Sequence, residues 1–571
     1  MKTERKNTFI KLVILELIIV ALVLLTHDVK YEVSDDFIME LMLSGTYSGT
    51  VNPHLLFSNY FWGLFLSVFY KLNAAVSWYL IWQMIVGFLS YIAVARVLSR
   101  KMDFIYAAGL LAIFNIGTVF DIFVLPQFTK TAAIALIAGG MLFLDALFDR
   151  DSIPDCIFGV VLFAVGALIR FKMLYAAMPF LFLYLIVKLI ERKDKECIKT
   201  IVYAVLTLSA VLCVRYLGSA LGSNSEEYRY FSQWKSARAQ YIDYYHPEYS
   251  EISAELNEAG ITENTLGMIN CWQYPDPSDP DLKKMNDLVE IVSEYRKSQT
   301  HSADEIVTAI RNRNMKRYPG AVICVLLGVI CCLLNRKRSL VPVICCFILL
   351  GYFAYFAYVQ RQVYRVESSC CMYAACIIAG SIRISDTRKP YVPAVIYGAV
   401  IAAVFLLWPL FTTTQYSNGS AGYEEYINAV FYDSGAYNKD KYRMVIDEEN
   451  VYPGFVAEAK ANPDKIYIMD FDTVIQKLYF FCDPFLSAAG QFPPNLVYMG
   501  GVLANYPEMN YYMRSLGYNS WAEALLSGKA YYVCNNRPEL MLNYYHEHGY
   551  TDVVMQEEKT IDGLTMYSFH E

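Results

Sequence analysis

Long apolar runs alternate along this chain with short polar connections. A helix needs about 20 mostly apolar residues to cross the hydrocarbon layer of a bilayer. Runs of this kind lie at 10–26, 76–98, 103–121, 130–148, 155–169, 173–190, 199–218, 319–335, 340–359, 368–384 and 391–411. The pattern therefore predicts an α-helical polytopic membrane protein with about 11 transmembrane helices.

One further apolar run, 54–71, is ambiguous, because counting it as a span would invert every later loop. Treated instead as a membrane-surface or re-entrant helix, it leaves every basic cluster in the cytoplasm, as the positive-inside rule requires. These clusters are Arg96/Arg100/Lys101, Lys188/Arg192/Lys193/Lys195, Arg336/Lys337/Arg338 and Arg383/Arg388/Lys389. We therefore expect a multi-pass protein of the cell membrane with a cytoplasmic N-terminus. The first span has no small-residue cleavage site after it, so we expect it to be retained.

The same topology divides the chain into four parts. Residues 1–218 form an N-terminal membrane core whose first outer loop is 27–75, and residues 219–318 form a large extracytoplasmic loop. Residues 319–411 return to the membrane, and 412–571 form an extracytoplasmic C-terminal domain.

The C-terminal part alternates strand-like and helical runs, which is typical of a small α/β domain. The strand-like runs are Ile466–Met469, Ala530–Cys534 and Thr551–Met555, and a helical run extends from Pro538 to His548. The pattern leaves the order and direction of the strands open.

Composition agrees with a membrane protein that also has exported soluble parts. Hydrophobic residues make up 56% of the 571 and charged residues 18%, below the roughly 25% of soluble domains. The 14 cysteines lie mostly in apolar runs without a CxxC pair, so we expect no disulfide framework and no structural metal. Basic residues outnumber acidic ones in the membrane part only, which favours an anionic membrane partner such as a lipid phosphate.

Two adjacent acids, Asp35 and Asp36, follow the first span at the outer membrane edge. Charges there are costly unless they face water or take part in chemistry. Two neighbouring carboxylates also tend to share a proton, since repulsion raises one pKa, and this suits a general base. The sequence Ser34-Asp-Asp before Phe37 also resembles a helix start, and the two interpretations are compatible.

Four basic residues in short outer loops break the positive-inside pattern. They are Arg170, Lys172, Arg361 and Arg365. Arginine at this level suits the clamping of a phosphate through its planar guanidinium. Each of the four could instead extend toward lipid headgroups, although all four doing so by chance is less easily explained.

The remaining polar residues of the outer loops are candidate contacts for a donor or an acceptor. They are His54, Asp121, Gln127 and Lys130. His54 is also a plausible turn residue after Pro53, and Lys130 a plausible anchor at a span end.

An acidic pair in the first outer loop, followed by a surface helix and large exported parts, resembles the GT-C superfamily of membrane glycosyltransferases. The layout is most similar to the protein O-mannosyltransferase and aminoarabinose transferase group and to related bacterial envelope transferases. The resemblance covers about residues 1–411. Asn52-Pro-His54 stands where many relatives have a His-Pro-Pro-like stretch, and this chain departs from that pattern.

The resemblance implies a polyprenyl-phosphate-linked sugar as donor and an envelope glycan, lipid or protein as acceptor. It maps the family's first-loop base onto Asp35 or Asp36, and the leaving phosphate onto Arg170, Lys172, Arg361 and Arg365. The loop has no DxD spacing, so a metal is not supported, and we expect no cofactor and no nucleic-acid partner.

Two other classes compete with the enzyme. A transporter or flippase would guide an anionic lipid past the outer basic residues without chemistry, but transporters usually carry ionisable or helix-breaking features at mid-membrane in paired halves. The chain shows no internal repeat of that kind. A membrane anchor for the acidic tail would not need so many spans.

Overall fold

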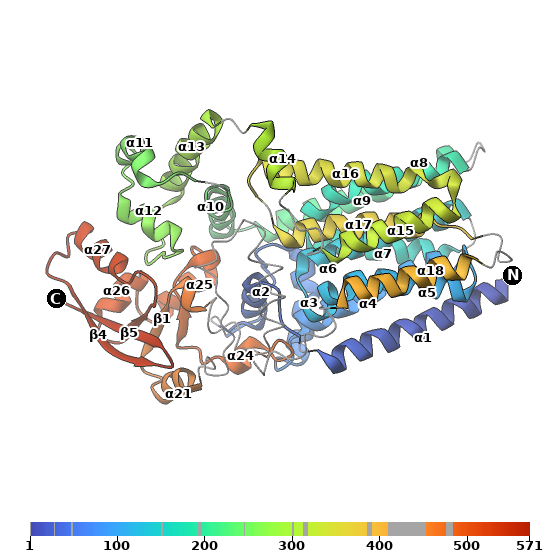
Figure 1. The fold of residues 1–571 in the computed structure, drawn as a ribbon. Coiled ribbons are helices and arrows are strands. Elements are labelled where there is room, and N and C mark those ends of the chain that lie inside the picture. Colours follow the sequence, from blue (N-terminus) through green and yellow to red (C-terminus); the bar gives the residue numbers. More distant parts are fainter. Residues whose placement is uncertain are drawn as a thin grey trace.

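The chain forms a bundle of apolar helices with a small helical unit and an α/β domain packed at one end of it, as the computed structural model shows (Figure 1). The start of α1 (Lys2–Thr26) lies at the end of the bundle remote from the C-terminal domain. The structure describes residues 2–27, 29–46, 49–149, 152–191, 197–244, 246–299, 302–311, 318–361, 363–384, 391–408, 453–474 and 483–571.

Each predicted span coincides with a helix. These helices are α1, α4 (Trp78–Ser99), α5 (Phe104–Val119), α6 (Phe128–Asp149), α7 (Ile153–Ile169), α8 (Lys172–Glu191), α9 (Cys197–Gly222), α15 (Pro319–Leu334), α16 (Leu340–Tyr358), α17 (Tyr364–Ser381) and α18 (Tyr391–Leu406). Within the described residues, seven helices are long and apolar enough to cross a membrane, and α7, α15 and α18 are shorter apolar helices. The chain is a multi-pass membrane protein.

Helix α6 is the centre of the bundle, with 94% of its apolar stretch buried. It packs on α4, α7, α8 and α17. Glycines allow α6 and α7 to touch through their backbones, because a Cβ on Gly139 would lie 2.6 Å from the amide nitrogen of Phe163. Inside a membrane the hydrophobic effect does not drive helices together, because lipid tails are also apolar. Small residues instead allow the close packing that holds the helices together. The close fit holds α6 firmly against α7.

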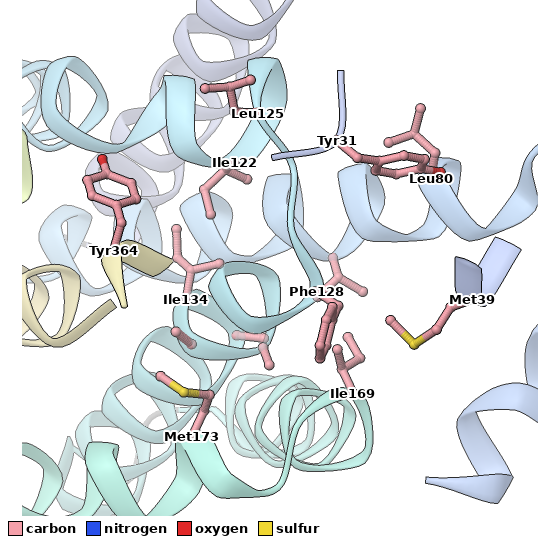
Figure 2. Close-up of a cluster of buried hydrophobic side chains, with 14 of the residues drawn as sticks. Tyr31, Met39, Leu80, Ile122, Leu125, Phe128, Ile134, Ile169, Met173 and Tyr364 are labelled. Atoms are coloured by element: carbon pink, nitrogen blue, oxygen red, sulfur yellow. The ribbon is translucent and has the colours of Figure 1, made fainter. Parts of the chain in front are cut away.

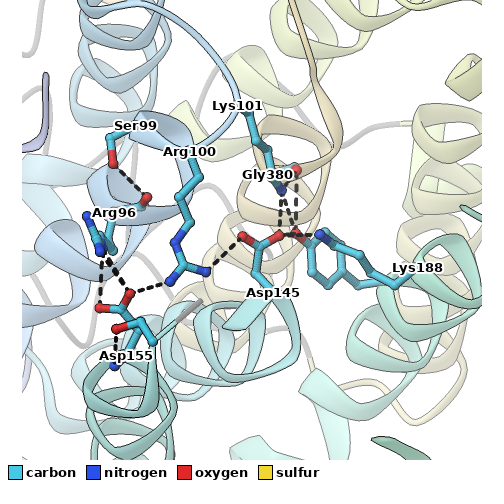
Figure 3. Close-up of polar contacts among 10 residues, drawn as sticks. Arg96, Ser99, Arg100, Lys101, Asp145, Asp155, Lys188 and Gly380 are labelled. Carbon is cyan, nitrogen blue, oxygen red and sulfur yellow. Dashed lines mark hydrogen bonds and ion pairs between the residues drawn. The ribbon is translucent and has the colours of Figure 1, made fainter. Parts of the chain in front are cut away.

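A charge network ties together the ends of α4, α6, α7 and α8 (Figure 3). Asp145 of α6 pairs with Lys101 at 2.9 Å and with Lys188, and Arg100 lies 3.7 Å from the same carboxylate. Asp155 pairs with Arg96 at 3.0 Å and with Arg100. Four basic residues predicted to be cytoplasmic, Arg96, Arg100, Lys101 and Lys188, therefore meet at one place, where Asp145 and Asp155 neutralise part of their charge.

Two short helices cover the opposite end of the bundle, α2 (Ser34–Ser44) and α3 (Tyr60–Leu72). Helix α3 has 13 residues and is too short to span a bilayer. It buries Trp62, Leu66 and Tyr70 and exposes Val68 and Leu72, as an interfacial helix does. This agrees with the prediction that the run 54–71 is not a span.

The large loop 219–318 forms a small helical unit. Its helices are α10 (Glu226–Ile242), η2 (Tyr249–Glu251), α11 (Ser253–Glu258), α12 (Glu263–Asn270), α13 (Leu282–Ser298) and α14 (Ala303–Arg311). A separate apolar core, with Trp234 of α10 and Met285 of α13 fully buried, holds the unit together.

The C-terminal domain is an α/β domain, as predicted. Its mixed sheet has the order β2-β1-β3-β5-β4, in which β1, β2 and β3 are parallel and β5 is antiparallel to both of its neighbours. The strands are β1 (Ile466–Met469), β2 (Leu496–Tyr498), β3 (Ala530–Val533), β4 (Val554–Ile561) and β5 (Leu564–His570). The helices are α21 (Pro453–Ala461), α22 (Phe471–Thr473), α24 (Ala488–Gln491), α25 (Pro507–Ser515), α26 (Trp521–Leu526) and α27 (Glu539–Glu547). The predicted start of this domain at 412 lies outside the described residues.

The two exported parts were expected as separate pieces, but they form one packed unit. Arg238 of α10 is buried and donates to the Gly501 carbonyl at 2.6 Å. Trp272 stacks on Phe471 of the C-terminal domain with ring centroids 4.9 Å apart. Neither part covers these aromatic faces alone, so each completes the core of the other.

Candidate functional site

Asp35 and Asp36 lie in the first turn of α2, which begins at Ser34. The helix start and the acidic pair therefore coincide, as the sequence allowed. No side chain caps this helix end, and carboxylates in the first turn interact favourably with its exposed amides. Local structure thus presents the two acids at a fixed point above the bundle.

Asp36 is completely buried, and its Oδ1 accepts three hydrogen bonds. The donors are the Tyr79 hydroxyl at 2.9 Å, the Gln83 side chain at 3.0 Å and the Phe128 amide at 3.0 Å. Its Oδ2 is also buried and has no partner within the described residues. Burial raises the pKa of Asp36 to about 8, so Asp36 keeps its proton at neutral pH, on the oxygen that is not already accepting.

Asp35 keeps a side-chain exposure of 22%. Its Oδ2 lies 3.5 Å from the guanidinium of Arg365. The two neighbouring acids therefore lie in different environments, Asp36 fully buried and Asp35 partly exposed beside a cation. The raised pKa of Asp36 comes first from burial, and the charge of Asp35 adds a smaller contribution.

Two stacked aromatic rings, Phe57 and Phe128, connect Arg170 to Asp36. Phe57 and Phe128 stack with an interplanar angle of 4°, and the Arg170 guanidinium lies 5.0 and 5.1 Å from their ring centroids. Phe128 is the residue whose amide holds Asp36. Burial lowers the pKa of Arg170 to about 10, and Asp35 opposes that shift. Phe128 thus contacts both Asp36, one of the two predicted bases, and Arg170, one of the predicted phosphate ligands.

The other two predicted clamp residues lie around Arg170. Arg361 pairs with Asp243 at 2.6 Å, and both Arg361 and Lys172 lie within electrostatic range of Arg170. The structure therefore gathers the four predicted basic residues, from two separate outer loops, around Arg170, and Arg365 of this group lies beside Asp35.

Lys235 of α10 adds a cation that the sequence did not indicate. Its ammonium donates to the Leu56 carbonyl at 2.6 Å. Burial lowers the pKa of Lys235 to about 7, and the charges of Arg238, Arg170 and Lys172 contribute in the same direction. Mutual repulsion among cations of this kind is relieved when an anion binds between them.

Lys130, Asp121 and Gln127 are not part of this cationic group. Lys130 pairs with Glu32 at 2.6 Å and with Asp121 at 2.9 Å, and all three side chains are buried. Asp121 lies in a π-helical turn, η1 (Phe120–Val124), that ends α5, and Gln127 accepts from the Thr129 amide at 2.6 Å. These residues lock α5 and α6 together beside the apolar cluster around Phe128 (Figure 2).

His54 also lies away from the acids. Its ring stacks on Tyr228 of α10 at 3.7 Å, and Nδ1 lies 2.9 Å from the Asn52 side-chain oxygen. Burial lowers the pKa of His54 to about 4, so the ring is neutral at physiological pH. His54 is a contact between the first loop and the exported helices, which fits its interpretation as a turn residue.

Sequence reasoning missed the residues that hold the site in place. Tyr79 and Gln83 orient Asp36, and Asp243 pairs with Arg361. Gln83 had a readable signal, because it is a polar residue inside an apolar span. Lys235 and Asp243 had none, since they lie in, and directly after, a helix of mixed polarity. Within the described residues, no three His, Cys, Asp or Glu side chains are grouped to hold a metal ion.

No protein-family model matches the chain, and no curated protein matches it either. Among solved structures, two of ArnT from Cupriavidus metallidurans are similar to it, one bound to undecaprenyl phosphate and one in the apo state. Each matches with a TM-score of 0.40 and 12% identity over 98% of this chain and 97% of that chain. The functional conclusion rests on the residues of the site itself.

The buried acids predict a loss of stability toward alkaline pH. Because the pKa of Asp36 is higher in the folded state than in an unfolded chain, the folded state binds more protons between about pH 4 and pH 8. Stability therefore falls as pH rises through that window, by up to roughly 3 kcal/mol between pH 6 and 8 for this group. Asp36→Asn should flatten the decline of Tm with pH, measured by tryptophan fluorescence in nanodiscs. An equally steep decline in the variant would show that Asp36 is ionised throughout.

Proposed function

We propose that this protein is a membrane glycosyltransferase that moves a sugar from a polyprenyl-phosphate donor to an extracytoplasmic envelope acceptor. The observation that supports it most is the placement of one partly exposed carboxylate, Asp35, beside Arg365 and within electrostatic range of Arg170, two cations from separate outer loops. A carboxylate suits proton removal from an acceptor hydroxyl. The cations suit a leaving phosphate. A lipid carrier has direct access to a site at the end of a helix bundle.

In this proposal Asp35 is the general base and Asp36 positions it. The acceptor hydroxyl oxygen attacks the anomeric carbon and the bond from that carbon to the phosphate oxygen breaks. The acceptor proton passes to the Asp35 carboxylate, and polyprenyl phosphate leaves with the electron pair. Asp36 is completely buried and protonated, so it is a poor proton acceptor. Inversion at the anomeric carbon is the expected outcome of a single displacement.

Arg365 has two partners in the proposed reaction. In the structure it pairs with Asp35 at 3.5 Å, a loose ion pair. An arriving phosphate competes for the guanidinium, and this frees the carboxylate for the acceptor. Arg170, with no carboxylate of its own within the described ion pairs, supplies a second cation at the same place. Arg361 and Lys172 complete the clamp in the proposal.

The proposal places the N-terminus in the cytoplasm and the α/β domain outside. The basic end of the bundle, with Lys101 and Lys188, then faces the cytoplasm as the positive-inside rule predicts. Donor and acceptor meet at the outer end, where Asp35 lies.

Release of sugar from lipid distinguishes the enzyme from a flippase. The protein in nanodiscs is incubated with a panel of polyprenyl-phosphate sugars carrying labelled sugar, together with envelope extract. We expect free polyprenyl phosphate and labelled acceptor to appear in equal amounts with at least one donor. Movement of intact labelled lipid across proteoliposomes, with no sugar released from any donor, would instead support the flippase.

A further inference from the structure

A short segment of the C-terminal domain, residues 483–492, lies against the first outer loop. Phe492 packs edge to face on Phe37, the neighbour of Asp36, with ring centroids 5.7 Å apart. Helix α24, which lies in this segment, packs on α2. The exported domain thus reaches the helix that carries the acidic pair.

Glu40 is the polar centre of this contact. It lies one helical turn after Asp36 and is only 2% exposed. Its Oε1 accepts from the Tyr70 hydroxyl of α3 at 3.0 Å, and its Oε2 accepts from the Ala488 amide at 2.7 Å. No basic side chain forms an ion pair with Glu40 within the described residues. The C-terminal domain therefore supplies a hydrogen-bond donor, the Ala488 amide, to this buried carboxylate.

The same segment also holds the start of α4. Val76 and Leu486 form an antiparallel bridge. Around it, Ser77 donates its amide to Phe485 at 2.9 Å, and Ser487 donates its amide to Ala75 at 3.0 Å. Helix α4 carries Tyr79 and Gln83, two of the three donors to Asp36. Residues 485–488 therefore tie together the two elements between which Asp36 is held.

We infer that Glu40 is a positioning residue through which the exported α/β domain fixes α2, and with it Asp35 and Asp36, over the bundle. The catalytic consequence rests on the proposed function, whereas the mechanical coupling does not. Tyr70 strengthens the link, because its hydroxyl also accepts from the Tyr79 amide at 3.1 Å. One carboxylate thus joins α2, α3, α4 and the C-terminal domain.

Two substitutions break the contact from opposite sides. Glu40→Gln keeps the shape of the side chain but replaces one accepting oxygen with an NH2 group. That group would face a donor, either the Tyr70 hydroxyl or the Ala488 amide. Ala488→Pro removes the amide that Glu40 accepts from, and its ring takes up space next to the carboxylate. Proline fits the backbone there, since Ala488 is the first residue of α24 and Ser487 before it is extended, with φ −63° and ψ 137°. Ala303→Pro, at the exposed first residue of α14, is the matched control.

The coupling is measured on the full-length protein in nanodiscs. Hydrogen exchange of the α2 amides should rise at least about 10-fold in Glu40→Gln and in Ala488→Pro, and stay unchanged in Ala303→Pro. Where transfer is measurable, kcat should fall roughly 10- to 100-fold with the KM for the lipid donor unchanged, because the cationic residues lie on other elements. The double variant Glu40→Gln/Ala488→Pro should be no worse than the more severe of the two single changes.

Unchanged hydrogen exchange of the α2 amides in Glu40→Gln, or fully additive effects in the double variant, would overturn the inference. If no donor supports transfer, the proposed function fails, and the exchange of α2 still decides the coupling. If Ala488→Pro does not fold, Glu40→Gln decides alone, since it leaves the backbone intact.

Discussion

Asp35→Asn is expected to lower sugar transfer about 10²- to 10⁴-fold, the usual contribution of a general base. Asp36→Asn should lower it less than about 10-fold. The asparagine oxygen can still accept from Tyr79, Gln83 and the Phe128 amide, and its neutral side chain resembles the protonated acid of the native protein. The measurement is the initial rate of polyprenyl phosphate release at saturating donor.

Asp36→Ala is the informative contrast to Asp36→Asn. It leaves three buried donors without an acceptor, each at a cost of about 1–3 kcal/mol, so we expect it to impair folding as well as transfer. If Asp36→Asn is inactive and Asp35→Asn is active, the roles of the two acids are reversed. Full activity in the double Asn variant would exclude both as the base.

Arg365→Gln should weaken the binding of polyprenyl phosphate roughly 10- to 150-fold. A hydrogen bond to a charged group contributes about 1.5–3 kcal/mol, and Arg365 is the cation in contact with Asp35. Native mass spectrometry in nanodiscs compares polyprenyl phosphate with the corresponding alcohol, which lacks the charge. The alcohol should bind equally to both proteins. Arg170→Gln should behave in the same way, with some loss of stability because the Arg170 guanidinium packs on Phe57 and Phe128.

The control for this series is Lys297→Gln, an exposed cation of α13 that lies in the exported unit. It should bind polyprenyl phosphate as the native protein does. A comparable loss in Lys297→Gln would show that general charge attraction, rather than a clamp, accounts for the affinity. Equal affinity of Arg365→Gln and the native protein would remove Arg365 from the donor site.

The membrane part of the fold could be predicted because its signal is local. Apolar length alone marks a span, and basic charge marks its cytoplasmic end. The ambiguous run 54–71 was resolved by charge, and α3 is indeed short and amphipathic. Apolar length is a poorer guide for α17, which is buried among other parts of the protein. Its first half carries Arg365, Glu367 and Ser368, so its composition alone does not mark it as a span.

The site was predictable only in outline. The acids and the outer arginines stand out because each is costly or unexpected where it lies. Which of them meet depends on contacts between distant segments, such as Arg361 with Asp243 and Arg170 with Phe57. Lys130 stays a predicted ligand contact, and the sequence did not indicate that its side chain pairs with Glu32 and Asp121 in the folded protein.

The packing of the exported unit could not be predicted at all. The strands of the C-terminal domain were visible as short β-rich runs, yet Glu40 carried no sign that its partner is the amide of Ala488, 448 positions away. A buried carboxylate that accepts from a backbone amide has no sequence signature on the amide side.

The charge network around Asp145 implies that the same lysines and arginines act at two stages in the life of the protein. During insertion, α4, α6, α7 and α8 have not yet assembled, so Lys101 and Lys188 are free charges that hold their helix ends on one side of the membrane. After assembly, both are bound to Asp145 and no longer offer charge to the surface. A lysine that orients the nascent helices thereby becomes part of the ion-pair network that holds the folded bundle together. Its loss would impair membrane insertion before it affects the folded protein.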